Sequence, residues 1–191
     1  MTNFHQQYKR HPLTYSTNSL ICTQTNNMQF YDATLQDLPL IVEIYNSTIA
    51  GRMVTADTEP VTVADRLNWF NAHQPLTRPL WMIWDKDECI GWVSFNSFYG
   101  RPAYDGTAEI SIYLHPAQRG KGYGKAILNH CTLAAPSLQI HTILGFIFSH
   151  NQPSISLFLQ AGFEQWGLLK DIAVMDGQHY SLTIFGQKTN S

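Results

Sequence analysis

The chain has 191 residues, the length of one domain with room for a short extension. Hydrophobic residues make up 44% of it and charged residues 14%, a balance typical of a globular protein and not of a disordered one. The formal net charge is −2 and no basic stripe is present, which argues against nucleic-acid binding because Lys and Arg must neutralise phosphates.

Signals for membrane insertion, secretion and metal binding are also missing from the sequence. No apolar run approaches the roughly 20 residues of a membrane-spanning helix, and the N-terminus does not look like a secretory signal. Cys22, Cys89 and Cys131 are odd in number and scattered, which argues against a disulfide framework and fits a reducing cytoplasm. No CxxC or HExxH motif and no His/carboxylate cluster occurs. We therefore expect a cytoplasmic protein without a metal site, and neither nucleic acid nor membrane as its partner.

The first 27 residues differ in composition from the rest. They are rich in Thr, Asn, Gln and Ser and show neither a helical nor a strand period. We expect residues 1–27 to be a disordered or loosely docked extension, and residues 28–191 to form the domain.

Two helices are predicted in the first half of the domain. Thr34 and Asp37 resemble a capping box, with Asp in place of Glu or Gln, and apolar residues follow at helical spacing as far as Ile49. Thr62 and Asp65 mark a second start of the same kind.

Strands then alternate with helices to the end of the chain. Strands are predicted from β-branched and aromatic runs, and a left-handed helix cap is predicted at Gly162. The expected strands are 81–84, 90–98, 108–114, 142–148, 164–174 and 179–186, and the expected helices are 122–135 and 154–161. This order predicts an α+β fold built on one mixed sheet.

The segment after strand 108–114 carries the clearest chemical signal. Gly120, Gly122 and Gly124 alternate along it, and the cationic residues Arg119 and Lys121 lie between and beside them. Glycines let a backbone approach a ligand closely, and the first turn of a helix has unpaired N–H groups at its positive end. The pattern predicts a site for a pyrophosphate, the alternative being a glycine-rich turn without a ligand. The spacing is neither that of a Walker loop nor that of the dinucleotide fingerprint.

These motifs resemble those of a known family. The run 119–124 resembles the R-x-x-G-x-G motif of the GNAT superfamily of N-acetyltransferases, and 151–163 resembles its N-x-x-S-x-x-L…G-F segment. Residues 101–116 are similar to the R-x-A-Y-x-x-T-x-E-x-S-x-Y-V-x-P segment of its phosphinothricin and L-amino acid N-acyltransferase subgroup. The I-Y-N at 44–46 and the R-x-x-W-F at 66–70 are similar to further motifs of that subgroup.

The resemblance covers roughly residues 29–186 and implies a cofactor site. It implies a largely antiparallel mixed sheet flanked by helices, in which a splayed strand pair holds acetyl-CoA. The pantetheine would lie along the strand before the loop, the pyrophosphate on the loop amides, and the Asn151 amide would hold the pantetheine. The implied cofactor-binding residues are Ile112, Tyr113, Leu114, Arg119, Gly120, Lys121, Gly122, Tyr123, Gly124, Lys125, Asn151 and Ser154.

Acetyl transfer to an amine requires a neutral nitrogen, so a general base is needed. The resemblance makes Glu109 the candidate, the alternative being a solvated or structurally paired carboxylate. Strand periodicity places Ser111 and Tyr113 on the same face as Glu109. Backbone amides near residues 112–114 are candidates for stabilising the oxyanion.

The acceptor site is implied by the same subgroup motif. Arg101 and Tyr104, with Glu109 and Ser111, are the predicted substrate-binding residues, because a guanidinium suits a carboxylate, phosphinate or sulfoximine oxygen. The alternative for Arg101 is an ordinary surface arginine.

The pattern departs from the family at two places. Phe158 stands where many members have Tyr or His, so it cannot protonate the departing thiolate. Residues 177–182 replace the subgroup's G-x-W-x-D element, with His for Trp and Ser for Asp, which weakens any transfer of substrate identity.

The leading hypothesis is an acetyl-CoA-dependent N-acetyltransferase for a small amino acid or amino-acid analogue of the phosphinothricin or methionine sulfoximine type. It would act by direct transfer in a ternary complex and, like its relatives, as a homodimer. One alternative is the same reaction on another amine, such as a polyamine, an antibiotic or a protein N-terminus. The others are an inactive acyl-CoA sensor and a non-catalytic scaffold with an empty glycine turn.

Overall fold

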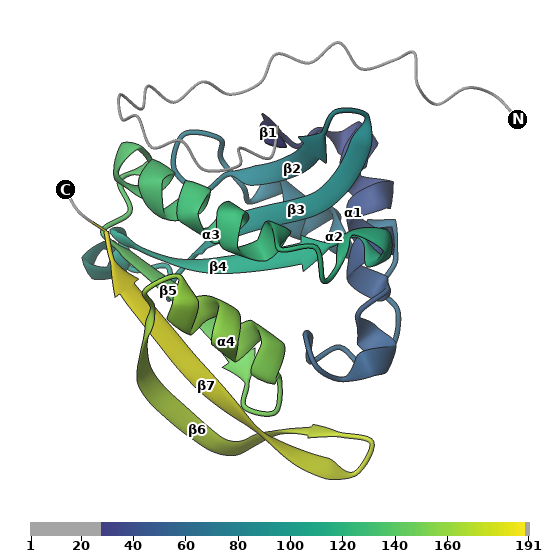
Figure 1. Ribbon diagram of the computed structural model, residues 1–191, viewed down its shortest axis with the longest axis vertical. Helices are drawn as coiled ribbons and strands as arrows, with labels where there is room; N and C mark the ends of the chain where they lie inside the picture. Colours follow the sequence, from purple (N-terminus) through teal and green to yellow (C-terminus); the bar gives the residue numbers. More distant parts are fainter. Residues whose placement is uncertain (1–27, 190–191) are drawn as a thin grey trace, which may run out of the picture.

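The structure, a computed structural model, describes residues 28–189 and is organised around a seven-stranded sheet (Figure 1). The strand order is β1-β2-β3-β4-β5-β7-β6, and only the β4–β5 pair is parallel. The predicted α+β class with a largely antiparallel mixed sheet is thereby confirmed. The predicted extension, residues 1–27, lies outside the described residues. The strands are β1 Met28–Asp32, β2 Leu80–Asp85, β3 Glu88–Ser97, β4 Thr107–Leu114, β5 Thr142–Phe148, β6 Glu164–Met175 and β7 Gln178–Lys188.

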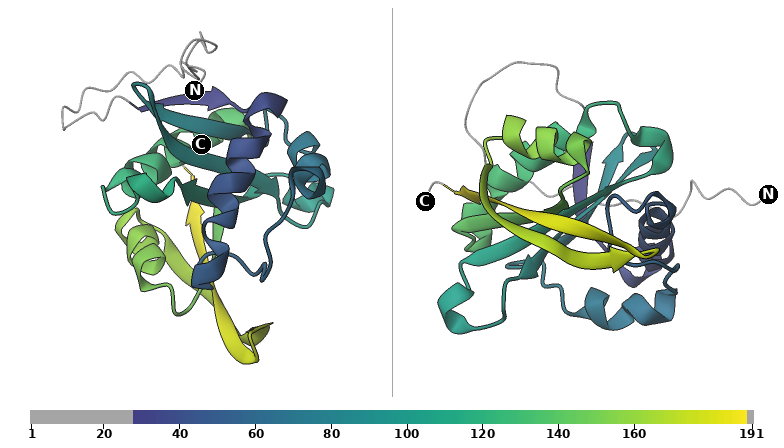
Figure 2. Two further views of the ribbon diagram at one scale, coloured as in Figure 1. Left: turned by 90° about the vertical axis from the view of Figure 1, so that its right-hand side faces the viewer. Right: turned by 90° about the horizontal axis from the view of Figure 1, so that it is seen from below.

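Within the described part of the chain, four α-helices cover the two faces of the sheet. Helices α1 (Leu38–Asn46) and α2 (Val63–Asn71) lie on one face, and α3 (Tyr123–Ala134) and α4 (Gln152–Gln160) on the other (Figure 2). Strand β2 is apolar at consecutive positions because both of its faces are buried. Its even-numbered Leu80 and Met82 join the core under α1, while the odd-numbered Trp81 and Ile83 join the core under α3.

The helix starts follow the predicted capping boxes. At α2, the Thr62 amide donates to the Asp65 carboxylate at 2.8 Å and the Asp65 amide donates to the Thr62 hydroxyl at 3.2 Å. The Thr34 amide donates to Asp37 in the same way at 2.7 Å, but a 3₁₀ turn over Leu35–Asp37 comes before α1.

Helix α1 ends earlier than the periodicity predicts. Its last residue is Asn46, and Ile49–Gly51 form a separate 3₁₀ turn. The hydroxyls of Ser47 and Thr48 donate to the carbonyls of Ile44 and Tyr45, at 2.5 Å and 2.7 Å. These bonds occupy carbonyls of the last turn, which is how hydroxyl side chains compete with continued helix.

The parallel pair β4–β5 is splayed. The two strands pair only from Thr107↔Thr142 to Glu109↔Leu144, although β4 continues to Leu114 and β5 to Phe148. Beyond Glu109 this edge of β4 has no paired strand among the described residues. The sheet therefore contains an internal open strand edge, which can hydrogen-bond an extended ligand. Along residues 28–189, no helix has the length and apolar character that crossing a membrane requires.

Candidate active site

A cavity of about 890 Å³ fills the space between the splayed strands. Backbone and side chains of β4, the glycine loop, the start of α3, the end of β5 and α4 line it. The predicted cofactor-binding residues that line it are Ile112, Tyr113, Leu114, Arg119, Gly120, Gly122, Tyr123, Gly124, Lys125, Asn151 and Ser154. The structure thus brings together residues that are up to 42 positions apart in the sequence, from Ile112 to Ser154.

The three glycines of the loop serve two different purposes. Gly120 and Gly122 have φ values of +74° and +84°, which side chains tolerate poorly, and Gly122 is the residue that precedes α3. At Gly124 a Cβ atom would lie 2.8 Å from Cδ2 of Leu157, so glycine lets α3 pack closely on α4. The result is a helix start at the wall of the large cavity, with the N–H groups that the first turn of a helix leaves without an intrahelical acceptor.

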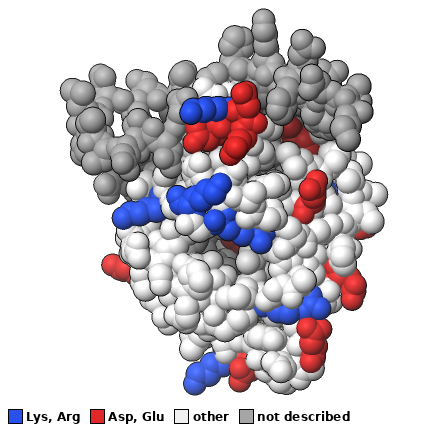
Figure 3. Space-filling model, turned by 45° about the vertical axis from the view of Figure 1, so that its right-hand side comes forward, with Lys and Arg blue, Asp and Glu red and all other residues white. Residues whose placement is uncertain are grey.

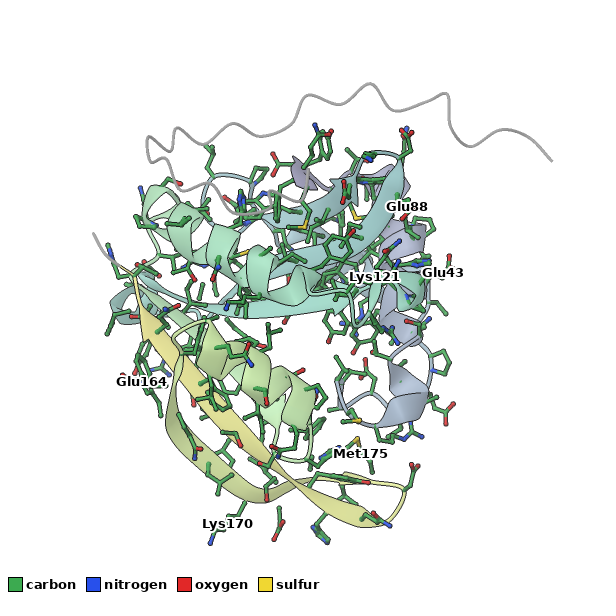
Figure 4. The ribbon with its side chains drawn as sticks, in the orientation of Figure 1. Glu43, Glu88, Lys121, Glu164, Lys170 and Met175 are labelled. Atoms are coloured by element: carbon green, nitrogen blue, oxygen red, sulfur yellow. The ribbon has the colours of Figure 1, made fainter. Side chains whose placement is uncertain are left out.

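The two loop cations have different surroundings. Arg119 lines the large cavity, and its guanidinium donates to the Leu114 carbonyl at 3.2 Å and to the Ser47 hydroxyl at 2.6 Å. Lys121 does not line it. Its ammonium donates to Gln118 at 2.9 Å, and Gln118 donates in turn to Glu88 at 2.8 Å. Figure 4 labels Lys121 and Glu88. Figure 3 shows Lys and Arg side chains gathered across the middle of one face.

Asn151 is the residue that precedes α4, and it is buried. Its side-chain oxygen Oδ1 accepts from the Ser154 amide at 3.2 Å, and its Nδ2 donates to the Met53 carbonyl at 2.9 Å. His150 beside it contacts the Arg52 carbonyl at 2.8 Å. The Asn151 side chain therefore caps a helix and also holds the 52–57 segment against the large cavity.

Glu109 is the last residue of β4 that pairs with β5, and it lies at the junction of two cavities. Its half-buried carboxylate lines both the large cavity and a second one of about 270 Å³. No hydrogen bond or ion pair joins it to any other residue in 28–189. Burial raises the pKa of this carboxyl above its usual value. An unpaired, desolvated carboxylate is well suited to receive an ammonium group or a proton.

The smaller cavity lies on the α1/α2 side of the sheet. One wall consists of three cross-strand pairs, Asn96↔Glu109, Ser94↔Ser111 and Trp92↔Tyr113, so the predicted alternation does bring Glu109, Ser111 and Tyr113 to one face. The opposite wall comes from the two helices and consists of Ile41, Val42, Tyr45, Arg66 and Trp69.

Aromatic rings make up much of this cavity. The rings of Trp92 and Tyr113 are stacked with centroids 4.4 Å apart, and Trp69 lies edge-on to Trp92 at 5.6 Å. The sequence predicts that the tryptophans pack in the core. It does not predict that Trp69 and Trp92 line a cavity. One feature of the sequence could have indicated this wall. Arg66 and Trp69 are three positions apart and therefore lie on one face of the helix.

The predicted acceptor residues Arg101 and Tyr104 lie in the connection between β3 and β4. Arg101 is exposed, and the Tyr104 ring packs against Phe98 at 5.6 Å and Tyr99 at 5.8 Å. Neither residue lines either cavity. Their contact with an acceptor stays a prediction.

Phe158 lies in the wall of the large cavity. Its ring is buried against Phe163 at 4.8 Å and Phe185 at 6.2 Å. A phenyl ring donates no proton, so this position contributes packing. Within residues 28–189, no group of three or more His, Cys, Asp or Glu side chains is arranged to hold a metal ion.

Comparison with known proteins shows which family this chain resembles. The model of the acetyltransferase (GNAT) family matches residues 41–163. YwnH of Bacillus subtilis, provisionally named a phosphinothricin acetyltransferase, is 52% identical over 80% of this chain and 94% of its own length. The L-methionine sulfoximine/L-methionine sulfone acetyltransferase of Pseudomonas aeruginosa is 31% identical over 80% of this chain and 89% of its own.

A solved structure shares the fold. The phosphinothricin acetyltransferase of Sinorhizobium meliloti in complex with acetyl-CoA superposes with a TM-score of 0.79 at 28% identity. The match covers 86% of this chain and 89% of the other.

Proposed function

Because the chain belongs to the GNAT family of acetyltransferases, we propose that it transfers an acetyl group from acetyl-CoA to the amino group of a small amino acid or amino-acid analogue. The relatives are named for phosphinothricin, methionine sulfoximine and methionine sulfone. The observation that carries the proposal is the position of Glu109, unpaired and shared by a large and a small cavity.

The large cavity suits acetyl-CoA. The loop amides from Gly120 to Lys125 would hold the pyrophosphate, since they lead into the first turn of α3, whose N–H groups have no acceptor within the helix. The open edge of β4 at residues 112–114 would pair with the amides of the pantetheine arm. When bound there, acetyl-CoA supplies a thioester carbonyl for nucleophilic attack.

Glu109 would act as the general base. Its carboxylate would take a proton from the acceptor's ammonium group, directly or through one water, and leave a neutral amine. The amine nitrogen then bonds to the thioester carbon, and backbone amides near residues 112–114 stabilise the oxyanion. Collapse breaks the C–S bond, and the sulfur leaves as a thiolate, which a thiol pKa near 8.5 allows although Phe158 donates no proton. The nitrogen loses its second proton in this step, to the departing thiolate or to water, so that the products are the neutral amide and CoA.

We also propose a homodimer in the cytoplasm. Strand β6 is an edge strand with a row of exposed apolar side chains, namely Trp166, Leu168, Leu169, Ile172 and Val174. An exposed apolar edge of this length favours pairing with a second copy. The cytoplasm is proposed because the three cysteines of the sequence are odd in number and scattered, which fits a reducing compartment.

The test uses the full-length protein with acetyl-CoA and a panel of amines, with thiol release as the readout. The panel holds phosphinothricin, methionine sulfoximine, methionine sulfone, common amino acids and a polyamine. Release of CoA with an amino-acid acceptor is the expected result. Calorimetric binding of acetyl-CoA without release from any amine would favour an acyl-CoA sensor instead, and absence of binding would favour a scaffold.

A further inference from the structure

The smaller cavity has a simple charge pattern. Eleven of the described residues line it, and two of these are charged, Glu109 with its carboxylate and Arg66 with its guanidinium. They come from different walls, Glu109 from β4 and Arg66 from α2. One anion and one cation in a cavity of about 270 Å³ match the ammonium and carboxylate of a single amino-acid zwitterion.

The Arg66 guanidinium is held in place by Asp57 and Tyr45. Its Nη2 donates to the carboxylate of Asp57 at 2.8 Å, and its guanidinium lies 4.2 Å from the centre of the Tyr45 ring. The Tyr45 hydroxyl also donates to Asp57, at 2.5 Å, and bonds to Thr55. Such contacts preorganise a guanidinium, so less freedom is lost when it binds an anion.

Most of the Arg66 donors are still available. A guanidinium has five N–H donors, and the bond to Asp57 is the one that Arg66 makes with the described residues. The Arg66 side chain is 24% exposed and contributes to the cavity surface. The remaining donors can bind a carboxylate in the two-pronged geometry that arginine favours.

We infer that Arg66 binds the α-carboxylate of the acceptor while Glu109 receives its α-amino group, which makes the substrate a free α-amino acid. The aromatic wall of Trp69, Trp92 and Tyr113 then accommodates its side chain. This inference rests on the proposed function and deepens it, because it names Arg66 as the residue by which the site would select an acceptor with a free α-carboxylate. It also gives Arg66 the anion-binding role that the sequence predicts for Arg101.

The test compares two acceptors that differ only at the carboxylate, L-methionine sulfone and its carboxamide. With the unaltered protein, kcat/KM should be about 10- to 100-fold higher for the acid, the range expected for charge-assisted hydrogen bonds. In Arg66→Gln this preference should disappear through a higher KM for the acid, with the Kd for acetyl-CoA unchanged. Arg66→Lys, which keeps the charge but loses the fork, should retain part of the preference.

Two further variants make the result specific. Asp57→Asn should raise the KM for the acid while retaining a preference for it, because Asp57 positions Arg66 and does not contact the substrate. Arg101→Gln should keep the full preference. The inference is overturned by equal use of both acceptors in the unaltered protein, by a preference that survives in Arg66→Gln, or by its loss in Arg101→Gln. No CoA release with any amine would instead refute the proposed function.

Discussion

Glu109 lies directly opposite Asn96 in the β3–β4 ladder, and both side chains line the smaller cavity. On its other side Glu109 pairs with Leu144, after which β4 and β5 separate. A single position therefore faces an acceptor-sized cavity and a cofactor-sized one. The splay of the two strands creates this arrangement, since a fully paired β4–β5 ladder would close the large cavity at Glu109.

Replacing Glu109 with Gln should lower kcat by about 10²- to 10⁴-fold, the usual contribution of a general base. The Kd for acetyl-CoA should not change, because the amide keeps the shape of the side chain. Glu43→Gln is the matched control, an exposed glutamate on α1 that lines neither cavity. Thiol-release kinetics and calorimetry measure both constants, and an unchanged kcat in Glu109→Gln would remove this residue from the mechanism.

The rate should fall in acid as Glu109 takes up a proton. Burial raises the pKa of Glu109 above the ordinary glutamate value, so the acidic limb of the kcat/KM profile should lie above that value. The limb should be absent from the residual activity of Glu109→Gln. A profile with the same acidic limb in both proteins would contradict this assignment.

The stability of the fold should depend on Glu109 in the opposite way to the rate, falling as the pH rises. A carboxyl whose folded pKa is raised favours the protonated folded state, so its ionisation destabilises the fold as pH rises through that pKa. Glu109→Gln should therefore unfold at an equal or higher Tm than the unaltered protein at pH 7. The difference should vanish below the ordinary glutamate pKa, which thermal unfolding at several pH values can measure.

Replacing Gly124 with Ala should displace the Leu157 side chain at the contact between α3 and α4. The added Cβ would lie 2.8 Å from the Leu157 side chain, and overpacking of this kind costs about 1–3 kcal/mol. Acetyl-CoA affinity should fall as well, because Gly124 lines the large cavity. Adding Leu157→Ala should recover part of the affinity. If Gly124→Ala binds acetyl-CoA normally, close packing at this glycine has no role in the site.

Asn151 offers a way to separate its two bonds. Asn151→Ser keeps a side-chain acceptor for the Ser154 amide but is too short to donate to the Met53 carbonyl, whereas Asn151→Ala loses both bonds. Loss of the cap alone should cost about 1 kcal/mol, so the Ser variant should be the more stable of the two. Both should bind acetyl-CoA more weakly, since Met53 also lines the large cavity. Equal unfolding free energies for the two variants would show that the cap contributes nothing.

If two copies pair through β6, charged substitutions on this strand should make the dimer dissociate into monomers. Leu168→Lys and Val174→Lys together should shift the sedimentation profile from dimer to monomer, since both side chains are exposed on this edge strand. Leu133→Lys is the control, an equally apolar and 70% exposed side chain on α3. A monomeric unaltered protein, or a dimer that survives both substitutions, would overturn the proposal.

The sequence alone was sufficient wherever the deciding contacts lie within a few residues. The capping box of Thr62 and Asp65, the left-handed backbone at Gly162 and the shared face of Glu109 and Ser111 follow from bonds or periods spanning at most four positions. The glycine loop belongs to the same group, because its backbone geometry is a local property of Gly120 and Gly122.

Tertiary structure decided the features that depend on distant partners. Strand β1 has only five residues and is specified by its ladder to β2, whose paired residues lie 49 to 57 positions away. Asn151 donates to the carbonyl of Met53, 98 positions away, and Arg66 from α2 lines the same cavity as Glu109 from β4. Residue spacing carries no record of such pairings, because they form only when loop closure and core burial bring the chain segments together.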